Sequence, residues 1–375
     1  MKKFFFAFLI SKSLQSHHPA YTLDAAFFRK RQKTEAEVLE NLARCEYEMI
    51  NRYSGLKVGE TIQVYDVPIE LNGKQEKIHT TRSGDNQKEN LVIIHGYLVG
   101  LVSFFRMLDD LSKHYKVYCI DLPGMGLSSR PDFTCQSTEE TIEFFTEAIE
   151  QWRKNAGIEK FHLAGLSFGG YMSAMYALKY PEHVKKLMLL SPAGVSRPTP
   201  EEQWRKELQQ LPWHYRKVFD LFISIWKNQY RPHDLNKISS IFRNPLLNLY
   251  VKRAKLVGEE HKFGYQYMDS LLQLPESTLK SVHLILTLPR AAGHMPLEDH
   301  LHKLKMPCEI YYGEWDWVSS EGAKRVVADK KIKGGFHIIP NAGHPMNFEN
   351  PKYLAQLMIS HMLKEGEENQ GDNTK

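Results

Sequence analysis

The chain has 375 residues, which is enough for one large α/β domain with an insertion or for two ordinary domains. Hydrophobic residues make up 42% and charged residues 25%, as in a soluble globular protein, and the net charge of +5 is modest. The four cysteines lie far apart without C-x-x-C spacing, which argues against a zinc site or a disulfide framework and favours reduced thiols: Cys45, Cys119, Cys135 and Cys308.

The N-terminus carries two lysines followed by a run of seven apolar residues, Phe4–Ile10. This run is at the lower limit for a signal peptide, and no clear A-x-A cleavage site follows it. It is also shorter than the roughly 20 residues that span a bilayer. We therefore predict an N-terminal segment, residues 1–55, that is a candidate for membrane contact, with a cleaved signal as the alternative.

A helix and a hairpin come first along the chain. Residues Leu23–Tyr53 are predicted to be helical, and a basic patch at residues 29–33 suits either a solvated helix end or an anionic surface. Two strand-like segments follow, TIQVYDVPIE and KQEKIHTTRSG. The dipeptide Asn72-Gly73 between them predicts a β-hairpin.

Strands then alternate with helices. Buried strands are predicted at 91–94, 116–121, 161–166 and 185–191, with helices at about 101–111 and 138–155 and after residue 167. Later come a strand at 308–313, a helix at 323–330, a strand at 336–340 and a helix that starts at Pro351 with Asn350 as its cap. This alternation predicts an α/β fold with a mostly parallel, doubly wound sheet.

The alternation stops between residues 196 and 295, where the sequence is helical and rich in large rings: Trp204, Trp213, Tyr215, Phe219, Phe222, Trp226 and Tyr230. Residues 196–265 hold thirteen Lys and Arg against seven Asp and Glu, a net charge of 13 − 7 = +6. We predict a helical cap at 196–295, inserted between core segments 56–195 and 296–364. Such a cap suits an amphipathic anionic ligand, or is an ordinary cap with a solvated face. The polar tail, 365–375, is predicted to be disordered.

The stretch FHLAGLSFGGY, residues 161–171, predicts the chemistry. A strand that turns sharply into a helix at a serine between small residues is a nucleophile elbow. Ser167 is the candidate nucleophile, and Gly165 and Gly169 are expected because a side chain would clash where the strand and the helix nearly touch.

A nucleophilic serine needs a base, and the base needs an acid that orients it. Asp316 lies just past the strand CEIYYG and is the predicted acid, with Glu314 as the near alternative. Glu298 and Asp299 fit less well because they precede that strand. His344, in a glycine-containing loop after the last strand, is the predicted base. His337 lies inside that strand and is interpreted as a filler of the core or surface.

Two backbone N–H groups are expected to form the oxyanion hole. One belongs to Phe168, directly after the nucleophile, and the other to Tyr97, in the loop after the LVIIHG strand. His95 is expected to brace that loop without a chemical role.

Taken together, these motifs resemble one family. They read HGYLVGLVSFFR, DLPGMGLSSRPDFTCQSTEET, GLSFGGY, YPEHVKKLMLLSPAGV, GHMPLEDHLHKLKMPCEIYYGEWDWV and NAGHPMNFENP. The chain is similar to the α/β-hydrolase-domain lipid enzymes, which include lysophospholipases and N-acylphospholipid lipases, the cardiolipin-specific deacylase and the lipase co-activators. Plant-like members resemble it most. The resemblance implies the α/β-hydrolase fold and maps the family's triad onto Ser167, Asp316 and His344.

The sequence departs from this family's pattern in two ways. The animal co-activator lacks the nucleophile, whereas this chain keeps Ser167, which favours an enzyme. The family's H-x4-D pattern is linked to lysophosphatidic acid acyltransferase activity, and here Glu349 stands in place of the aspartate.

We therefore predict a serine hydrolase of phospholipid or lysophospholipid esters. The alternatives are an acyltransferase that uses acyl-CoA and a lipid-droplet protein that regulates a partner lipase. No metal, nucleotide cofactor or nucleic acid is implied. The expected location is cytoplasmic, at a membrane or lipid-droplet surface, with secretory or mitochondrial targeting left open.

Overall fold

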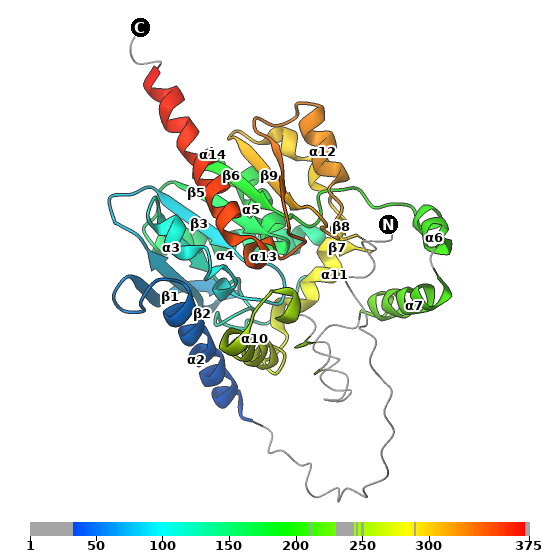
Figure 1. The fold of residues 1–375 in the computed structure, drawn as a ribbon, viewed down its shortest axis with the longest axis horizontal. Coiled ribbons are helices and arrows are strands. Elements are labelled where there is room, and N and C mark those ends of the chain that lie inside the picture. The colour runs from blue at the N-terminus through cyan, green and yellow to red at the C-terminus, as the bar shows by residue number, and fades with distance from the viewer. Residues whose placement is uncertain are drawn as a thin grey trace, which may run out of the picture.

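The computed structural model describes residues 33–371, with gaps at 211, 230–243, 245–246, 249–250 and 289. The apolar N-terminal run, most of the basic patch, Tyr230 and the side chains of Tyr215, Phe219 and Phe222 lie outside this description. An eight-stranded sheet crosses the molecule in the order β1-β2-β4-β3-β5-β6-β9-β10 (Figure 1). Its strands are β1 (Ile62–Leu71), β2 (Lys74–Ser83), β3 (Asn90–Ile94), β4 (Lys116–Ile120), β5 (Phe161–Leu166), β6 (Val184–Leu190), β9 (Cys308–Gly313) and β10 (Phe336–Ile339).

The two ends of the sheet differ in strand direction. β1 and β2 form the predicted hairpin, and both turn residues, Asn72 and Gly73, have positive φ (53° and 71°), as a tight hairpin turn requires. β2 pairs antiparallel with β4, and every pair from β4 to β10 is parallel. The predicted α/β class with a mostly parallel sheet is confirmed.

Helices cover both faces of the sheet. On one face a hydrophobic cluster joins the sheet to α4 (Thr138–Asn155), α5 (Phe168–Lys179) and α12 (Glu321–Ala328). On the other face a second cluster joins it to α2 (Glu35–Tyr53), α3 (Leu108–Ser112), α13 (Met346–Glu349) and α14 (Pro351–Gly371). The parallel strands are therefore buried from both sides, which explains why they are continuous apolar runs in the sequence.

The structure corrects two sequence predictions. The segment 101–111 is not one helix but a 3-10 turn, η2 (Leu101–Phe104), followed by α3. The apolar side chains of this segment are buried. The N–H of Leu101, at the start of η2, bonds to the carboxylate of Asp121. The tail 365–371 is helical, because α14 continues to Gly371 and extending an existing helix is easier than starting one.

Between β6 and β9 the described residues are mainly helical. It forms α6 (Glu201–Gln209), α7 (Trp213–Lys227), α10 (Gly258–Leu271), η3 (Ser277–Lys280) and α11 (Ser281–Ile285), and then a small ladder of β7 (Leu286–Thr287) with β8 (Ala292–Gly293). α10 packs against α2 on one side of the molecule (Figure 1). Among the described residues, no helix combines the length and apolar composition needed to cross a bilayer.

Candidate active site

Ser167 lies in the sharp turn between β5 and α5. Its backbone has φ 55° and ψ −114°, a strained conformation for a residue other than glycine. A Cβ atom on Gly169 would lie 2.2 Å from the carbonyl oxygen of His95, and one on Gly165 would lie 2.4 Å from that of Gly169. The elbow therefore requires glycine at both positions, and its strain holds the serine hydroxyl at the first turn of α5.

His344 and Asp316 reach the same place from two other strands. Nε2 of His344 lies 2.9 Å from Oγ of Ser167, and Nδ1 of His344 lies 3.1 Å from Oδ1 of Asp316. Asp316 follows β9 and His344 follows β10, so all three side chains come from the carboxyl ends of parallel strands. A chain of hydrogen bonds from serine through imidazole to carboxylate is the arrangement that activates serine in acyl-transfer enzymes.

The carboxylate of Asp316 is buried and well supplied with donors. Oδ1 also accepts a hydrogen bond from the backbone N–H of Val318, at 3.0 Å. Oδ2 accepts one from the hydroxyl of Ser191, which directly follows β6. The sequence analysis missed Ser191. The signal that could have found it is a polar residue at the carboxyl end of the strand that pairs with β9.

The alternative acids point elsewhere. Glu314 is exposed, and its carboxylate accepts a hydrogen bond from the backbone N–H of Asn341. Glu298 is bonded to Arg325, and Asp299 to Arg197. None of these three acids bonds to His344 in the described structure, so the geometry favours Asp316.

The loop that carries His344 is braced on two sides. The carboxylate of Glu349 accepts a hydrogen bond from the backbone N–H of Gly343, directly before the histidine. The ring of Trp317 lies 5.2 Å from the imidazole of His344. Glu349 therefore acts on the conformation of this loop.

The two segments expected to supply the oxyanion donors lie beside Ser167. The N–H of Phe168 is the first of α5, so it has no acceptor within that helix. The residue before Tyr97 is Gly96, and a Cβ there would lie 3.4 Å from Cβ of Ser167. The Tyr97 hydroxyl bonds to the carbonyl of Leu279, 2.7 Å away, which ties this loop to η3.

His95 braces the same loop from inside the core. Its Nδ1 donates to the carbonyl of Gly96 at 2.7 Å, and its Nε2 accepts from the N–H of Leu122 at 3.0 Å. The ring is fully buried, and this burial lowers the pKa of His95 to about 4. The imidazole is therefore neutral at physiological pH and supports the loop, as the sequence analysis expected.

A model of the alpha/beta hydrolase fold matches residues 89–351. The chain belongs to the α/β-hydrolase family. The predicted family and fold are thus confirmed.

Its relatives include lipid enzymes of two kinds. A probable 1-acylglycerol-3-phosphate O-acyltransferase from Oryza sativa subsp. japonica is 32% identical over 287 residues, covering 72% of this chain and 66% of that protein. The 1-acylglycerol-3-phosphate O-acyltransferase of Arabidopsis thaliana is 33% identical, over 70% of this chain and 63% of that one. A (lyso)-N-acylphosphatidylethanolamine lipase from Mus musculus is 27% identical, over 70% and 78%. The chain thus spans just under two thirds of the length of the two plant proteins.

Solved structures share the fold at low sequence identity. The naproxen esterase of Bacillus subtilis superposes with a TM-score of 0.60 at 17% identity, covering 86% of this chain and 97% of the esterase. A membrane phospholipase A described as a bacterial virulence factor gives 0.56 at 20% identity, covering 88% and 91%. These likenesses concern the α/β-hydrolase fold alone.

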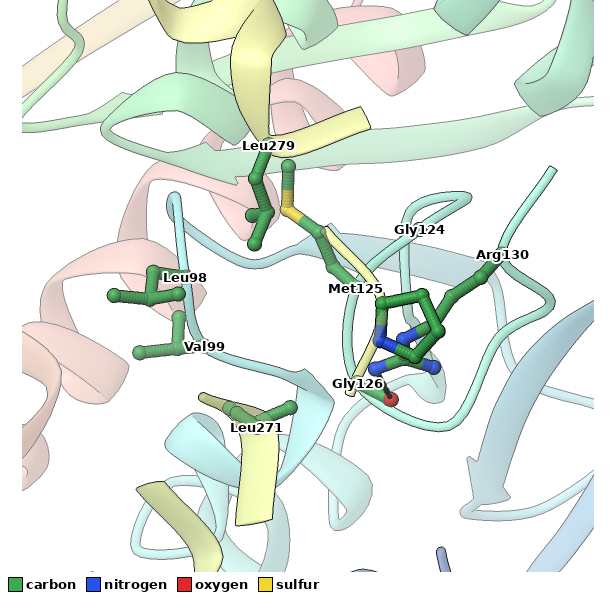
Figure 2. Close-up of a pocket in the computed structure, with 9 residues that line it drawn as sticks. Leu98, Val99, Gly124, Met125, Gly126, Arg130, Leu271 and Leu279 are labelled. Carbon is green, nitrogen blue, oxygen red and sulfur yellow. Dashed lines mark hydrogen bonds between the residues drawn. The ribbon is translucent and has the colours of Figure 1, made fainter. Parts of the chain in front are cut away.

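A small cleft adjoins the loop after β3 of this α/β hydrolase (Figure 2). Figure 2 shows Leu98 and Val99 on one side and the loop with Met125 and Arg130 on the other. Leu279 lies above and Leu271 below. The guanidinium of Arg130 is bonded to the carbonyls of Ser128 and Gly126 in its own loop. The lining of this cleft is mostly apolar.

Two groups in the described parts of this α/β hydrolase bring three metal-binding atoms within 4.8 Å: Glu309, His337 and His361, and Glu46, His79 and Asp121. In the first group His337 is bonded to Glu309 at 2.7 Å. In the second, Glu46 and Asp66 bond to the two nitrogens of His79. Burial opposes the charge on His79, but these carboxylates outweigh it and raise its pKa to about 10. In each group the histidine is thus hydrogen-bonded to a carboxylate of the same group.

Proposed function

We propose that the chain is a serine hydrolase that cleaves an acyl ester of a phospholipid or lysophospholipid. One observation carries the chemistry: Nε2 of His344 lies 2.9 Å from Oγ of Ser167 while Nδ1 faces Asp316. The 2.9 Å contact is within hydrogen-bond reach for direct proton transfer.

In the first half of the reaction, Nε2 of His344 takes the proton of Ser167 as Oγ attacks the ester carbonyl carbon. Asp316 holds the imidazole in the tautomer with the proton on Nδ1 and stabilises the cation that forms. The N–H groups of Phe168 and Tyr97 bind the negatively charged oxygen of the tetrahedral intermediate. When the intermediate collapses, the leaving alcohol takes the proton from His344, and the acyl group stays on Ser167.

In the second half, water enters and His344 takes one of its protons. The hydroxide attacks the acyl-enzyme, the Ser167–acyl bond breaks, and Oγ regains the proton from His344. If the hydroxyl of a lysolipid replaces water, the same steps transfer the acyl group to that lipid, so the site is then a transacylase.

The choice of lipid esters rests on the comparisons and on charge. Relatives named as a lipase of lyso-N-acylphosphatidylethanolamine type and as acyltransferases of 1-acylglycerol-3-phosphate support a lipid acyl ester. The cap sequence, with a net charge of +6 over residues 196–265, favours an anionic head group. We further propose that the enzyme works at a membrane or lipid-droplet surface.

The test uses wild type and Ser167→Ala with mixed phospholipids, with and without acyl-CoA, and follows the products by mass spectrometry. We expect free fatty acid and lysolipid from wild type alone, without acyl-CoA. Retained lipid hydrolysis by a correctly folded Ser167→Ala protein would contradict the proposed serine mechanism. The identity of the lysolipid names the head group.

The second candidate is an acyltransferase that uses acyl-CoA, which the names of the two plant relatives favour. Because the carboxylate of Glu349 accepts a hydrogen bond from the N–H of Gly343, Glu349 helps to hold the His344 loop in place. A product that requires acyl-CoA and survives Ser167→Ala would support this candidate. If neither protein forms a product, and Ser167 does not react with a fluorophosphonate, the remaining reading is a regulator of a partner lipase.

A further inference from the structure

Two large indole rings are exposed beside the candidate site. Trp315 and Trp317 flank the buried Asp316, and they are 45% and 40% exposed. Trp317 lies against the imidazole of His344, and a Cβ on Gly343 would lie 2.9 Å from Cδ1 of Trp315. Both indoles come from the segment that carries Asp316 and pack against the loop that carries His344.

A basic segment of the cap contacts the other side of this loop. Nζ of Lys255 bonds to the carbonyl oxygens of Asn341 and Glu349, each at 3.3 Å. Lys252, one turn earlier, is exposed, and so is the side chain of Val257, at 72%. We call Trp315, Trp317, Lys252, Lys255 and Val257 the site rim.

Arg106 ties this cap segment to α13, which directly follows the His344 loop. Its Nη1 donates to the carbonyl of Phe348 at 3.0 Å, and its Nη2 donates to the carbonyl of Lys255 at 3.2 Å. The half-buried Arg253 adds positive charge near Glu349. The acids at this edge all have partners. The carboxylate of Glu314 accepts from the N–H of Asn341, Glu260 is paired with Arg106 and Glu259 with Arg52.

The rim thus combines exposed indoles, an exposed aliphatic side chain and cations beside the loop that carries His344. Indole rings prefer the boundary between water and lipid, since one end is apolar and the N–H still finds a partner. Lysines near an anionic bilayer gain electrostatic attraction. We propose that the site rim docks on the head-group layer of an anionic phospholipid surface. The functional consequence of this docking rests on the proposed function, because docking would orient Ser167 toward the lipid esters of the surface.

The test measures binding apart from catalysis. The full chain carrying Ser167→Ala is sedimented with vesicles of phosphatidylcholine, with and without phosphatidylserine. We expect stronger binding to the anionic vesicles. Adding Lys252→Glu should weaken this binding by about fivefold or more, since each basic residue near the surface contributes about that factor. Trp315→Ala should weaken it about tenfold, because less apolar area leaves water.

A matched control is Trp213→Ala, which removes a 63% exposed indole from α7 with Lys217 over its ring. It should bind like the parent. Val257→Asp, on the rim, should weaken binding even if Trp315→Ala fails to fold. Equal binding to both vesicle types, or equal losses from Trp213→Ala and Trp315→Ala, would overturn the proposal.

A second readout separates this proposal from the proposed function. With Ser167 intact, Lys252→Glu should hydrolyse a soluble short-chain ester at the wild-type rate and vesicle lipid more slowly. If wild type hydrolyses no soluble or vesicle ester while the anionic vesicles still bind through the rim, the proposed function fails and the docking surface stands. If Lys252→Glu hydrolyses vesicle lipid at the wild-type rate, the docking proposal fails.

Discussion

The hydroxyl of Ser191 donates a hydrogen bond to Oδ2 of Asp316, while His344 contacts Oδ1 of the same carboxylate. Because the two contacts hold the two carboxylate oxygens, they fix the plane of the carboxylate. The orientation of the Asp316 carboxylate toward His344 therefore depends on Ser191, which follows β6. Ser191 is thereby a positioning residue for the proposed base.

We predict that Ser191→Ala lowers kcat for ester hydrolysis by about tenfold, because a hydrogen bond to a charged group is worth about 1.5–3 kcal/mol. The loss should fall on kcat more than on KM, since Ser191 acts through Asp316. Steady-state kinetics with a soluble ester measure this effect. Ser196→Ala is the control, because Ser196 bonds to Ser319 and Gly322 and not to Asp316. Equal losses in both variants would contradict the assigned role.

The two acids of the GEWDWV segment give a second prediction. Asp316→Asn should reduce kcat by about 10³-fold or more, because an amide at this position favours the wrong imidazole tautomer. Glu314→Gln should stay near the wild-type rate, because Glu314 is exposed and bonds to Asn341. Kinetics and circular dichroism of both variants test this. A larger loss in Glu314→Gln than in Asp316→Asn would reverse the assignment.

The elbow glycine at 169 gives a prediction about stability. A Cβ there would lie 2.2 Å from the carbonyl oxygen of His95, a backbone atom that has no alternative rotamer. Gly169→Ala should therefore cost about 4 kcal/mol or more, in the range of severe core strain. Gly73→Ala, in the hairpin turn with open space around it, should cost only about 1–2 kcal/mol from its positive φ. Urea unfolding of both proteins compares them, and similar costs would refute the steric account.

Much of this arrangement follows from local sequence signals. The hairpin turn, the buried parallel strands and the elbow each depend on residues that are neighbours in the chain, so a short window carries the information. The order of Ser167, Asp316 and His344 along the chain, each after a strand, then predicts their meeting at one edge of the sheet. The structure brings these three side chains together.

Other contacts depend on residues far apart in the sequence. Ser191 reaches Asp316 only because β6 pairs with β9, and the cap lies between them in the chain. The start of η2 is held by Asp121, whose carboxylate accepts a hydrogen bond from the N–H of Leu101. Neither contact leaves a periodic pattern, so the sequence analysis predicted a single helix and overlooked the serine.

The burial of His95 leads to a prediction about pH. The folded protein holds this imidazole at a pKa of about 4, because burial disfavours its charged form, whereas an unfolded histidine titrates near 6.5. Between these two values the unfolded state binds more protons than the folded state. The stability contributed by the neutral His95 is therefore complete above about pH 6.5 and is lost as the pH falls toward 4.

We predict that the titration of His95 lowers the free energy of unfolding of the wild type by about 2 kcal/mol when the pH falls from 7 to 5. One pKa unit corresponds to about 1.4 kcal/mol. His95→Gln removes the titrating group, so its stability should fall less steeply over this interval, even though the variant starts from a lower value. His114→Gln, at an exposed histidine, should keep the wild-type slope. Urea unfolding at a series of pH values gives the three slopes. An unchanged slope in His95→Gln would mean that His95 takes up a proton in the folded protein. Water or a local opening would then have to reach the imidazole beneath the loop after β3.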